Sequence, residues 1–395
     1  MTFRKVIFWI HLIAGVIAGI SIFIMCLTGA ALAFEKDIVA FAERDVRRVK
    51  IGDPNARKSL FELQAAVKAA QPEARPTAIV VSTDPAAAVT FQLGRNGALY
   101  ADPYTGEVRQ PATTRTHDLM HVLEDWHRVL AMSGDNRPIG KAINGACNIA
   151  FFVLAVTGLY IWWPRKWRTK GLRRSLWFMK TEGGKARDWN WHNVIGFWSS
   201  PVLIVLTLTA LPISYRWAGD LIYKLAGEEP PVRSGPPVAA TPAVEIPAPP
   251  PGTRPVSPDA LLLSAQSALP EWKEITLRLG VAGRGPRGGG EEAKNSGPQP
   301  ISVAVKTPGA WPQTAYTTLI LNPFTAEILK TETFADLSSA RRFRTWTRFL
   351  HTGEALGWLG QFVAGLASLG GCVLVYTGFA LTWRRFQRWR SQRAA

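Results

Sequence analysis

Four of the six histidines in this 395-residue chain occupy matching places at the ends of long apolar stretches. His11 and His192 lie near the start of two such stretches, and His127 and His351 shortly precede two others, in the segments EDWHRVL and TRFLHTG. An ionisable ring is costly inside a membrane, so its presence indicates a functional site. If the four stretches are membrane helices, the histidines form one pair near each membrane face.

Two imidazoles that face each other at equal depth can bind an iron porphyrin, with one ring on each axial side. The sequence therefore predicts that His11 and His192 hold one b-type haem and that His127 and His351 hold a second. The alternative is structural, because a single intramembrane histidine can instead hydrogen-bond to a carbonyl group of a neighbouring helix. The pairing of the histidines by position favours the ligand interpretation.

The two remaining histidines, His117 and His121, leave further alternatives open. Their i, i+4 spacing could place both on one helix face for zinc, but no third ligand with zinc spacing accompanies them. His121 also competes with His127 as a ligand of the second haem. We prefer His127 because His351 is its counterpart, and we keep His121 in reserve.

Small, aromatic and basic residues flank the four candidate ligands. Glycines would let a flat macrocycle approach the backbone, and basic side chains could pair with haem propionates. Each group also has an ordinary interpretation: glycines pack helices, tryptophans form an interfacial belt and arginines set topology. The residues concerned are Gly15, Gly19, Gly145 and Gly365; Trp9, Trp126, Trp191, Trp198 and Trp346; and Arg4, Arg187, Arg128 and Arg348.

Four apolar stretches are long enough to position these residues in a bilayer, which takes roughly 20 residues per helix. They cover residues 6–34, 141–163, 193–217 and 357–383. The first stretch has basic residues in front of it, as a signal peptide has, but its apolar run is nearly twice as long as a signal-peptide core. We therefore expect it to remain as a membrane span.

The net charge of +17 is concentrated beside the ends of these stretches. Nine basic and two acidic residues lie in 164–190, and five arginines follow Trp383. This pattern follows the positive-inside rule and predicts a bacterial inner-membrane protein with both termini in the cytoplasm. It also removes nucleic acid as the expected partner. All three cysteines lie in the predicted spans, so no disulfide framework is expected in the exported parts.

The chain reads as two copies of one unit, each a span, an exported α+β module and a second span. The exported segments share the turn sequences ADPYTGEV (101–108) and LNPFTAEI (321–328). His11 precedes Thr28 by seventeen positions, and His192 precedes Thr209 by the same number. Internal repeats of this kind often place a site between the copies.

The predicted fold is an α-helical membrane protein with a four-helix transmembrane bundle and two periplasmic α+β modules. A Pro-rich linker at about 228–258 should be extended and mobile, and a Gly-rich insertion occupies 280–299. The predicted boundaries are helix 1 (1–34), module 1 (35–138), helix 2 (139–163), a basic loop (164–190), helix 3 (191–217), module 2 (218–350), helix 4 (351–383) and a basic tail (384–395).

The motifs together resemble a known family. The DPYTGEV-like segments look like PepSY domains, and HLIAG, WHNVIG, DWHRVL, LHTG and TGLYIWWPRKW resemble the PepSY-associated transmembrane family. The resemblance implies similarity to haem-containing inner-membrane ferric-siderophore reductases, in which two haems pass electrons to the periplasmic side. It implies that His11, His192, His127 and His351 are the ligands and that a ferric siderophore is the acceptor. The electron donor, on the cytoplasmic or quinone side, is expected to be a separate molecule.

Two departures from the repeat affect these expectations. The third stretch has LTALP where the others have a Thr-Gly pair, so Pro212 could kink its end. Ala326 replaces Gly106 in the second turn, which puts the shape of that turn in doubt.

Two other functions stay open at the level of sequence. The PepSY-like modules could bind peptides or regulate a peptidase, with the spans as anchors and no haem. The chain could also be a haem reductase or quinol oxidase with another acceptor. Motifs for acid–base or nucleotide chemistry, such as GxSxG, HExxH or a P-loop, are absent from the sequence.

Overall fold

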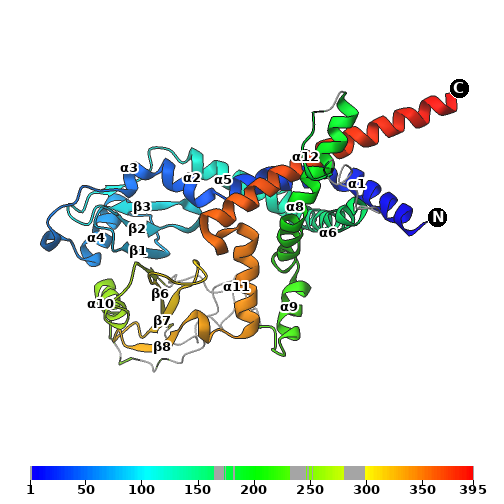
Figure 1. Cartoon of the computed structure of the whole chain (residues 1–395). Coiled ribbons are helices and arrows are strands. Elements are labelled where there is room, and N and C mark those ends of the chain that lie inside the picture. The colour runs from blue at the N-terminus through cyan, green and yellow to red at the C-terminus, as the bar shows by residue number, and fades with distance from the viewer. Residues whose placement is uncertain are drawn as a thin grey trace. The chain divides into compact units, whose positions relative to one another are not determined.

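The structure is a computed structural model that describes residues 2–163, 173, 175–180, 183–231, 246, 249–250, 252–279 and 299–394 (Figure 1). Most of the predicted Pro-rich linker, nearly all of the Gly-rich insertion and part of the basic loop lie outside these residues. The chain divides into two compact units. The bundle unit contains Met1–Glu35, Asp118–Glu229 and Ser339–Ala395, and the sheet unit contains Lys36–His117 and Pro230–Ser338.

Four long helices make up most of the bundle unit: α1 (Phe3–Leu32), α6 (Arg137–Trp162), α8 (Gly184–Ser214) and α12 (Gly357–Ala394). All four are long and apolar enough to cross a membrane, and an 18-residue stretch within each has a mean hydropathy of 2.5, 1.8, 2.0 and 1.7, respectively. This agrees with the four predicted spans. α8 begins within the predicted basic loop, and it continues through Pro212 to end at Ser214.

Apolar side chains and buried amides hold the long helices together. Ile22, Met25 and Cys26 of α1 pack against Cys147 of α6 and Cys372 of α12, and all three thiols are free. Across the bundle, the Asn148 side chain of α6 donates to the Thr207 carbonyl of α8 at 3.0 Å. Such bonds satisfy polar groups that have no access to water in a bilayer.

Shorter helices cap the end of the bundle unit at which α1 and α8 finish. They are α5 (Arg115–Val129), η3 (Gly134–Asn136), α9 (Arg216–Leu225), α11 (Ser339–Thr352) and η6 (Glu354–Leu356). α5 and α11 immediately precede the helical segments that lead into α6 and α12. The predicted module boundaries had assigned both short helices mainly to the exported modules, whereas the structure groups nearly all of α5 and the whole of α11 with the bundle.

The sheet unit contains one eight-stranded antiparallel sheet with the order β4-β3-β2-β1-β5-β6-β7-β8. The strands are β1 (Ala78–Ser82), β2 (Val89–Gln92), β3 (Ala98–Ala101), β4 (Val108–Arg109), β5 (Glu274–Arg278), β6 (Ile301–Lys306), β7 (Thr317–Leu321) and β8 (Ile328–Glu332). The two predicted modules therefore share a single sheet. The join is made by β1 and β5, from Ala78 opposite Arg278 to Ser82 opposite Glu274.

Two equivalent helices complete the core of the sheet unit. They are α4 (Leu60–Ala70) and α10 (Pro258–Ala268), each with a serine N-cap that accepts from the first-turn backbone. The Asp259 carboxylate of α10 also accepts from the amides of Leu60 and Phe61 at 2.6 and 2.9 Å. The remaining described helices are α2 (Glu35–Ala42), α3 (Arg44–Arg47), η1 (Pro54–Ala56), η2 (Gly94–Asn96) and η5 (Phe334–Asp336).

The two sequence-matched turns have the same backbone conformation. Gly106 has φ +79° and Ala326 has φ +58°, so both lie in the left-handed region. Their amides donate to the carbonyls of Asp102 and Asn322 at 2.8 and 3.0 Å. The turn at Ala326 therefore has the same shape as the turn at Gly106. Its cost is an alanine in the left-handed region, where glycine is favoured.

Candidate functional site

The structure brings the four sequence-selected histidines together as two pairs. Pair 1 consists of His11 from α1 and His192 from α8, with ring centroids 6.4 Å apart and an interplanar angle of 84°. Pair 2 consists of His127 from α5 and His351 from α11, with centroids 6.2 Å apart and an angle of 52°. Each pair thus takes one ring from each half of the chain.

The separation within each pair fits one metal ion between two rings. Imidazole nitrogens bind metal ions at about 2.0–2.1 Å, so two rings that bind opposite sides of one ion through Nε2 have centroids about 6.3 Å apart. The observed 6.4 and 6.2 Å match this value. Aromatic rings in edge-to-face contact also have centroids about 4.5–7 Å apart, so the distances fit both arrangements, and the ligand interpretation depends on the hydrogen bonds described next.

Each ring of pair 1 is held by a threonine of a neighbouring helix. His11 Nδ1 lies 2.9 Å from the Thr157 hydroxyl of α6, and His192 Nδ1 lies 2.9 Å from the Thr377 hydroxyl of α12. Both hydroxyls donate to a carbonyl four residues earlier on their own helix, at 2.6 and 2.7 Å. Because the hydroxyl proton is used in this way, each threonine oxygen accepts a hydrogen bond from the protonated Nδ1 of its histidine.

This arrangement fixes the tautomer of the neutral rings. A neutral imidazole that carries its proton on Nδ1 presents a lone pair on Nε2. Metal-binding histidines almost always donate their other ring N–H in this manner, which fixes the ring orientation and raises the basicity of the ligand. The Nε2 atoms of pair 1 are therefore the ring atoms that could bind a metal ion.

Pair 2 is held in a similar way, with one difference. His127 Nδ1 lies 3.0 Å from the Thr28 hydroxyl of α1, which itself donates to the Ile24 carbonyl at 2.7 Å. His351 Nδ1 instead donates to the backbone carbonyl of Leu206 in α8 at 2.9 Å. Burial lowers the pKa of His127 to about 4 and also lowers the pKa of His351, so both rings are neutral at physiological pH.

A glycine follows each of the three threonines and leaves room for the histidine ring. A Cβ atom added at Gly29, Gly158 or Gly378 would lie 3.0, 3.3 or 3.6 Å from the Cε1 atom of His127, His11 or His192, respectively. We call each such threonine–glycine pair a ring seat. The place in α8 that corresponds to a ring seat is occupied by Thr209 and Ala210. Here His351 bonds to the Leu206 carbonyl, one turn before Thr209, and not to the threonine.

The ring seats were not recognised as site residues from the sequence, although the seventeen-residue spacing had marked one of their threonines, Thr28. The glycines that were singled out instead pack against other side chains. A Cβ atom added at Gly19 would lie 2.6 Å from the Phe379 ring, and one added at Gly365 would lie 3.0 Å from the Phe34 ring. These two positions therefore serve close packing within the bundle.

The four arginines considered as propionate partners have other interactions. Arg187 forms an ion pair with Asp188 at 2.9 Å, and Arg128 pairs with Glu124. Arg4 donates to the carbonyls of Ile161 and Trp163. Arg348 lies over the ring of its neighbour in sequence, with its guanidinium carbon 5.8 Å from the centroid.

A buried carboxylate ties the helices that carry pair 1. Asp188 of α8 is completely buried, and its second oxygen lies 2.6 Å from the Arg384 guanidinium of α12. Asp188 precedes His192 by one helical turn, and Arg384 lies two turns beyond Thr377. The ion pair therefore fastens α8 to α12 close to the ring seat of His192.

The reserve histidine does not join either pair. His121 Nδ1 lies 3.5 Å from the Glu124 carboxylate on the same helix. Within the described part of the chain, no group of three or more His, Cys, Asp or Glu side chains could hold a metal ion. The zinc alternative for His117 and His121 thus gains no third ligand.

Comparison with protein families matches residues 8–385 to the PepSY-associated TM region. The chain belongs to the PepSY-associated TM region family. The match begins within α1 and ends within α12, so it includes all or most of each of the four spans and all six histidines. No curated protein matches the chain significantly.

The two pairs of this PepSY-associated membrane protein lie at opposite ends of its bundle. Helix α1 carries His11 and, seventeen residues later, Thr28, which holds His127. At 1.5 Å per residue, the two sites are about 25 Å apart along this helix. This distance approaches the roughly 30 Å thickness of the hydrocarbon core.

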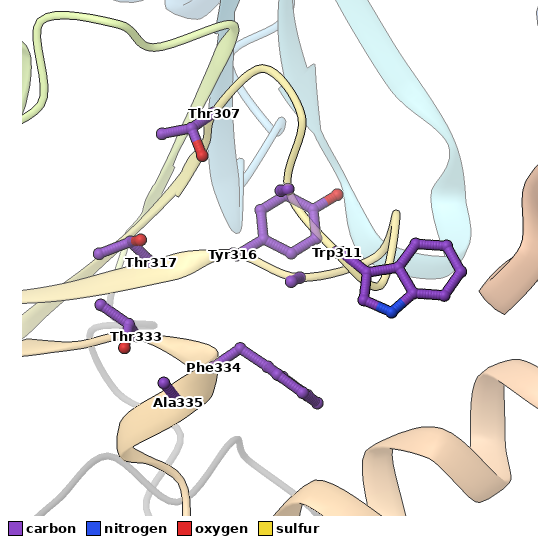
Figure 2. A pocket seen from close by; sticks show the side chains of 9 residues that line it. Thr307, Trp311, Tyr316, Thr317, Thr333, Phe334 and Ala335 are labelled. Carbon is purple, nitrogen blue, oxygen red and sulfur yellow. The ribbon is translucent and has the colours of Figure 1, made fainter.

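The sheet unit carries a separate pocket of about 240 Å³ at the ends of β6, β7 and β8. Figure 2 shows the aromatic rings of Trp311, Tyr316 and Phe334 around it, together with threonine side chains. Its lining contains no histidine, carboxylate or cysteine. The lining therefore consists of aromatic, alanine and threonine side chains.

Proposed function

We propose that this protein is a haem-dependent oxidoreductase that carries electrons across the bacterial inner membrane and reduces a ferric chelate, such as a ferric siderophore, in the periplasm. Two haem b groups would be held by His11 with His192 and by His127 with His351. The observation that carries the proposal is the set of two imidazole pairs, with centroids at 6.4 and 6.2 Å, in which the Nδ1 atom of every ring has a hydrogen-bond partner on a neighbouring helix.

The chemistry of bound haem is a one-electron change at its iron. The contribution of the chain is to place the ligands at two depths about 25 Å apart and to hold each ring in one tautomer. The apolar interior of the bundle limits access of water to the rings. This division of labour, in which the protein positions and tunes while the cofactor supplies the electron chemistry, is general for cofactor enzymes.

The distribution of charge supports the proposed direction of transfer. Basic residues of the described chain gather at the end of the bundle that carries pair 1, including Arg4, Lys5, Lys185 and the arginines of the last turns of α12. By the positive-inside rule this end is cytoplasmic, and pair 2 then lies toward the periplasm. Electrons would enter near pair 1, from a cytoplasmic or quinone-linked donor, and leave near pair 2.

Reduction of the acceptor would release its iron. Hard oxygen ligands hold ferric iron more tightly than ferrous iron, so the added electron weakens the chelate. The sheet unit, which we propose to consist of two PepSY-like modules, is the exported part of the chain. Equivalent ring seats, turns and helix caps in the two halves support an internal duplication that generated both modules and both halves of the bundle.

The test is the visible spectrum of the detergent-purified protein, air-oxidised and then reduced with dithionite, together with haem quantified per polypeptide. We expect two haems in the native protein and one in His351→Ala, because pair 1 keeps both of its ligands. His192→Ala is the matched variant and should lose the other haem. Two haems retained in both variants would refute the ligand assignment.

The acceptor is tested separately by mixing the reduced protein with ferric chelates and following reoxidation of the haem bands. Reoxidation by a quinone but by no ferric chelate would leave the haem sites standing and reject the proposed substrate. A protein that is colourless after expression with ample haem supply would instead favour a PepSY-type peptide-binding or peptidase-regulating anchor.

A further inference from the structure

A short helix just outside the third span has three distinct faces. Helix α9 (Arg216–Leu225) begins two residues after Ser214, where α8 ends. One face of α9 packs within the bundle unit through Ala218, Gly219 and Tyr223, all of which are buried. The other two faces are turned away from the protein.

The first of these outer faces is apolar. Trp217, Leu221 and Leu225 follow one another at four-residue intervals, and their exposed fractions are 56%, 43% and 79%. Residues four apart lie on the same side of an α-helix, so the three side chains form a continuous stripe. Three large apolar side chains in a row on a water-facing helix would be an unusual exposed patch.

The second outer face is polar. It consists of Arg216, Asp220 and Lys224, each one position before a residue of the apolar stripe. Arg216 and Asp220 form an ion pair at 3.6 Å. α9 therefore presents a polar and an apolar surface side by side, in addition to its packed face.

The apolar stripe resembles the lipid-facing surface of the span that precedes it. On α8, Val205, Leu208 and Ile213 are exposed by 42%, 49% and 46%, because nothing but lipid would cover them. The stripe on α9 is exposed to a similar or greater degree and starts four residues after Ile213. The surface that needs an apolar environment thus continues past the end of α8.

We propose that Trp217, Leu221 and Leu225 insert into the interfacial layer of the same bilayer, so that α9 is a membrane-surface helix at the end of the bundle that carries pair 2. Helices with one apolar and one charged face bind membranes in this way. Tryptophan is enriched at this depth, and the long Arg216 and Lys224 side chains can extend to lipid phosphates. The partner of the stripe is a lipid surface.

This placement would brace the helix that carries His351. The Glu228 carboxylate, three residues beyond α9, accepts a hydrogen bond from the Ala340 amide in the first turn of α11 at 3.1 Å. Gly219 of α9 lies so close to the Arg344 guanidinium of α11 that an added Cβ atom would be 2.7 Å from it. A membrane-bound α9 would therefore hold α11 at a fixed height above the bilayer.

The test uses the full chain in phospholipid vesicles, with nitroxide labels at single cysteines. The three native cysteines are replaced by alanine, and labels are placed at Leu221 and Leu225, with Asp220 and Lys224 as matched positions one residue away. We expect the ratio of collision rates with oxygen and with a water-soluble nickel chelate to be several-fold higher at the two leucine positions. Leu208 on α8 gives the reference value for lipid exposure.

Two outcomes would overturn the proposal. Equal ratios at all four α9 positions would show that the stripe faces water. Exclusion of both reagents from the leucine positions, with immobilised labels, would show that a second copy or another protein covers it. If the cysteine-free chain does not fold, the tryptophan fluorescence of native protein and of Trp217→Phe is measured in ordinary and in brominated lipids. The difference between the two proteins is the emission of Trp217. The proposal requires that brominated lipids strongly quench this difference.

Discussion

Replacement of the seat threonines of pair 1 by valine isolates the role of a single hydrogen bond. Valine has nearly the shape of threonine, so Thr157→Val and Thr377→Val leave the packing in place and remove the acceptor for Nδ1–H of His11 and His192. Each variant leaves a buried ring N–H without its partner. Loss of such a supporting bond typically weakens metal binding by about 10–100-fold, which corresponds to about 1.4–2.7 kcal/mol.

The assay is a haem titration of the haem-depleted protein in detergent, followed by absorbance in the Soret region. Each single variant should weaken one of the two haem-binding steps by about 10–100-fold and leave the other step unchanged, because both threonines serve pair 1 alone. The matched control is Thr207→Val. The Thr207 hydroxyl donates to the Leu203 and Ile204 carbonyls of its own helix, and in the described structure no imidazole bonds to this hydroxyl or to these two carbonyls.

Two results would refute the reasoning. If Thr207→Val weakens haem binding as much as Thr377→Val does, the effect belongs to the helices in general and not to the ring seat. If the double variant of Thr157 and Thr377 binds both haems with unchanged affinity and spectrum, the threonines do not position the rings.

Three further predictions concern the seats, the buried carboxylate and one turn. Gly29→Ala would place a Cβ atom 3.0 Å from an imidazole carbon of pair 2 and should lower the haem content of the purified protein, whereas Gly378→Ala leaves 3.6 Å and should keep it; equal loss in both would contradict the steric argument. Asp188→Asn leaves two arginines without their shared carboxylate and should destabilise the bundle by about 1–3 kcal/mol, seen as a lower thermal unfolding temperature in detergent; an unchanged temperature would show that the ion pairs are unimportant. Ala326→Gly relieves a left-handed alanine and should stabilise the sheet unit by up to about 1 kcal/mol, so an earlier thermal transition than in the native chain would contradict it.

The sequence was informative where a repeated spacing marked chemically special residues. The four spans and the partners within each histidine pair followed from apolar length and from the matched positions of His11 with His192 and of His127 with His351. The spans and the histidine partners could be predicted because hydropathy and repeated spacing can be read directly from the sequence. The ligand role itself stays a prediction.

The ring seats could not be derived in the same way, because they depend on which helix lies beside which. His11 is held by Thr157, which is 146 positions away, and nothing in either local sequence names the other as a partner. Gly19 and Gly365 had been considered for contact with a macrocycle, yet they pack against Phe379 and Phe34. A small residue shows only that something comes close, and the structure is needed to identify what that is.

The pairing of β1 with β5 has a consequence for how the chain is made. In the sequence, β1 precedes the spans α6 and α8 and β5 follows them, although the two strands are neighbours in the sheet. Thr83 accordingly bonds to Lys273, 190 positions later. At about 5–20 residues per second, the ribosome needs roughly 10–40 s to make this stretch. During that time the first four strands wait with the backbone of β1 open at their edge, in a form that invites wrong pairing. Biogenesis of the protein therefore has a vulnerable interval, which closes only when β5 has been made and pairs with β1.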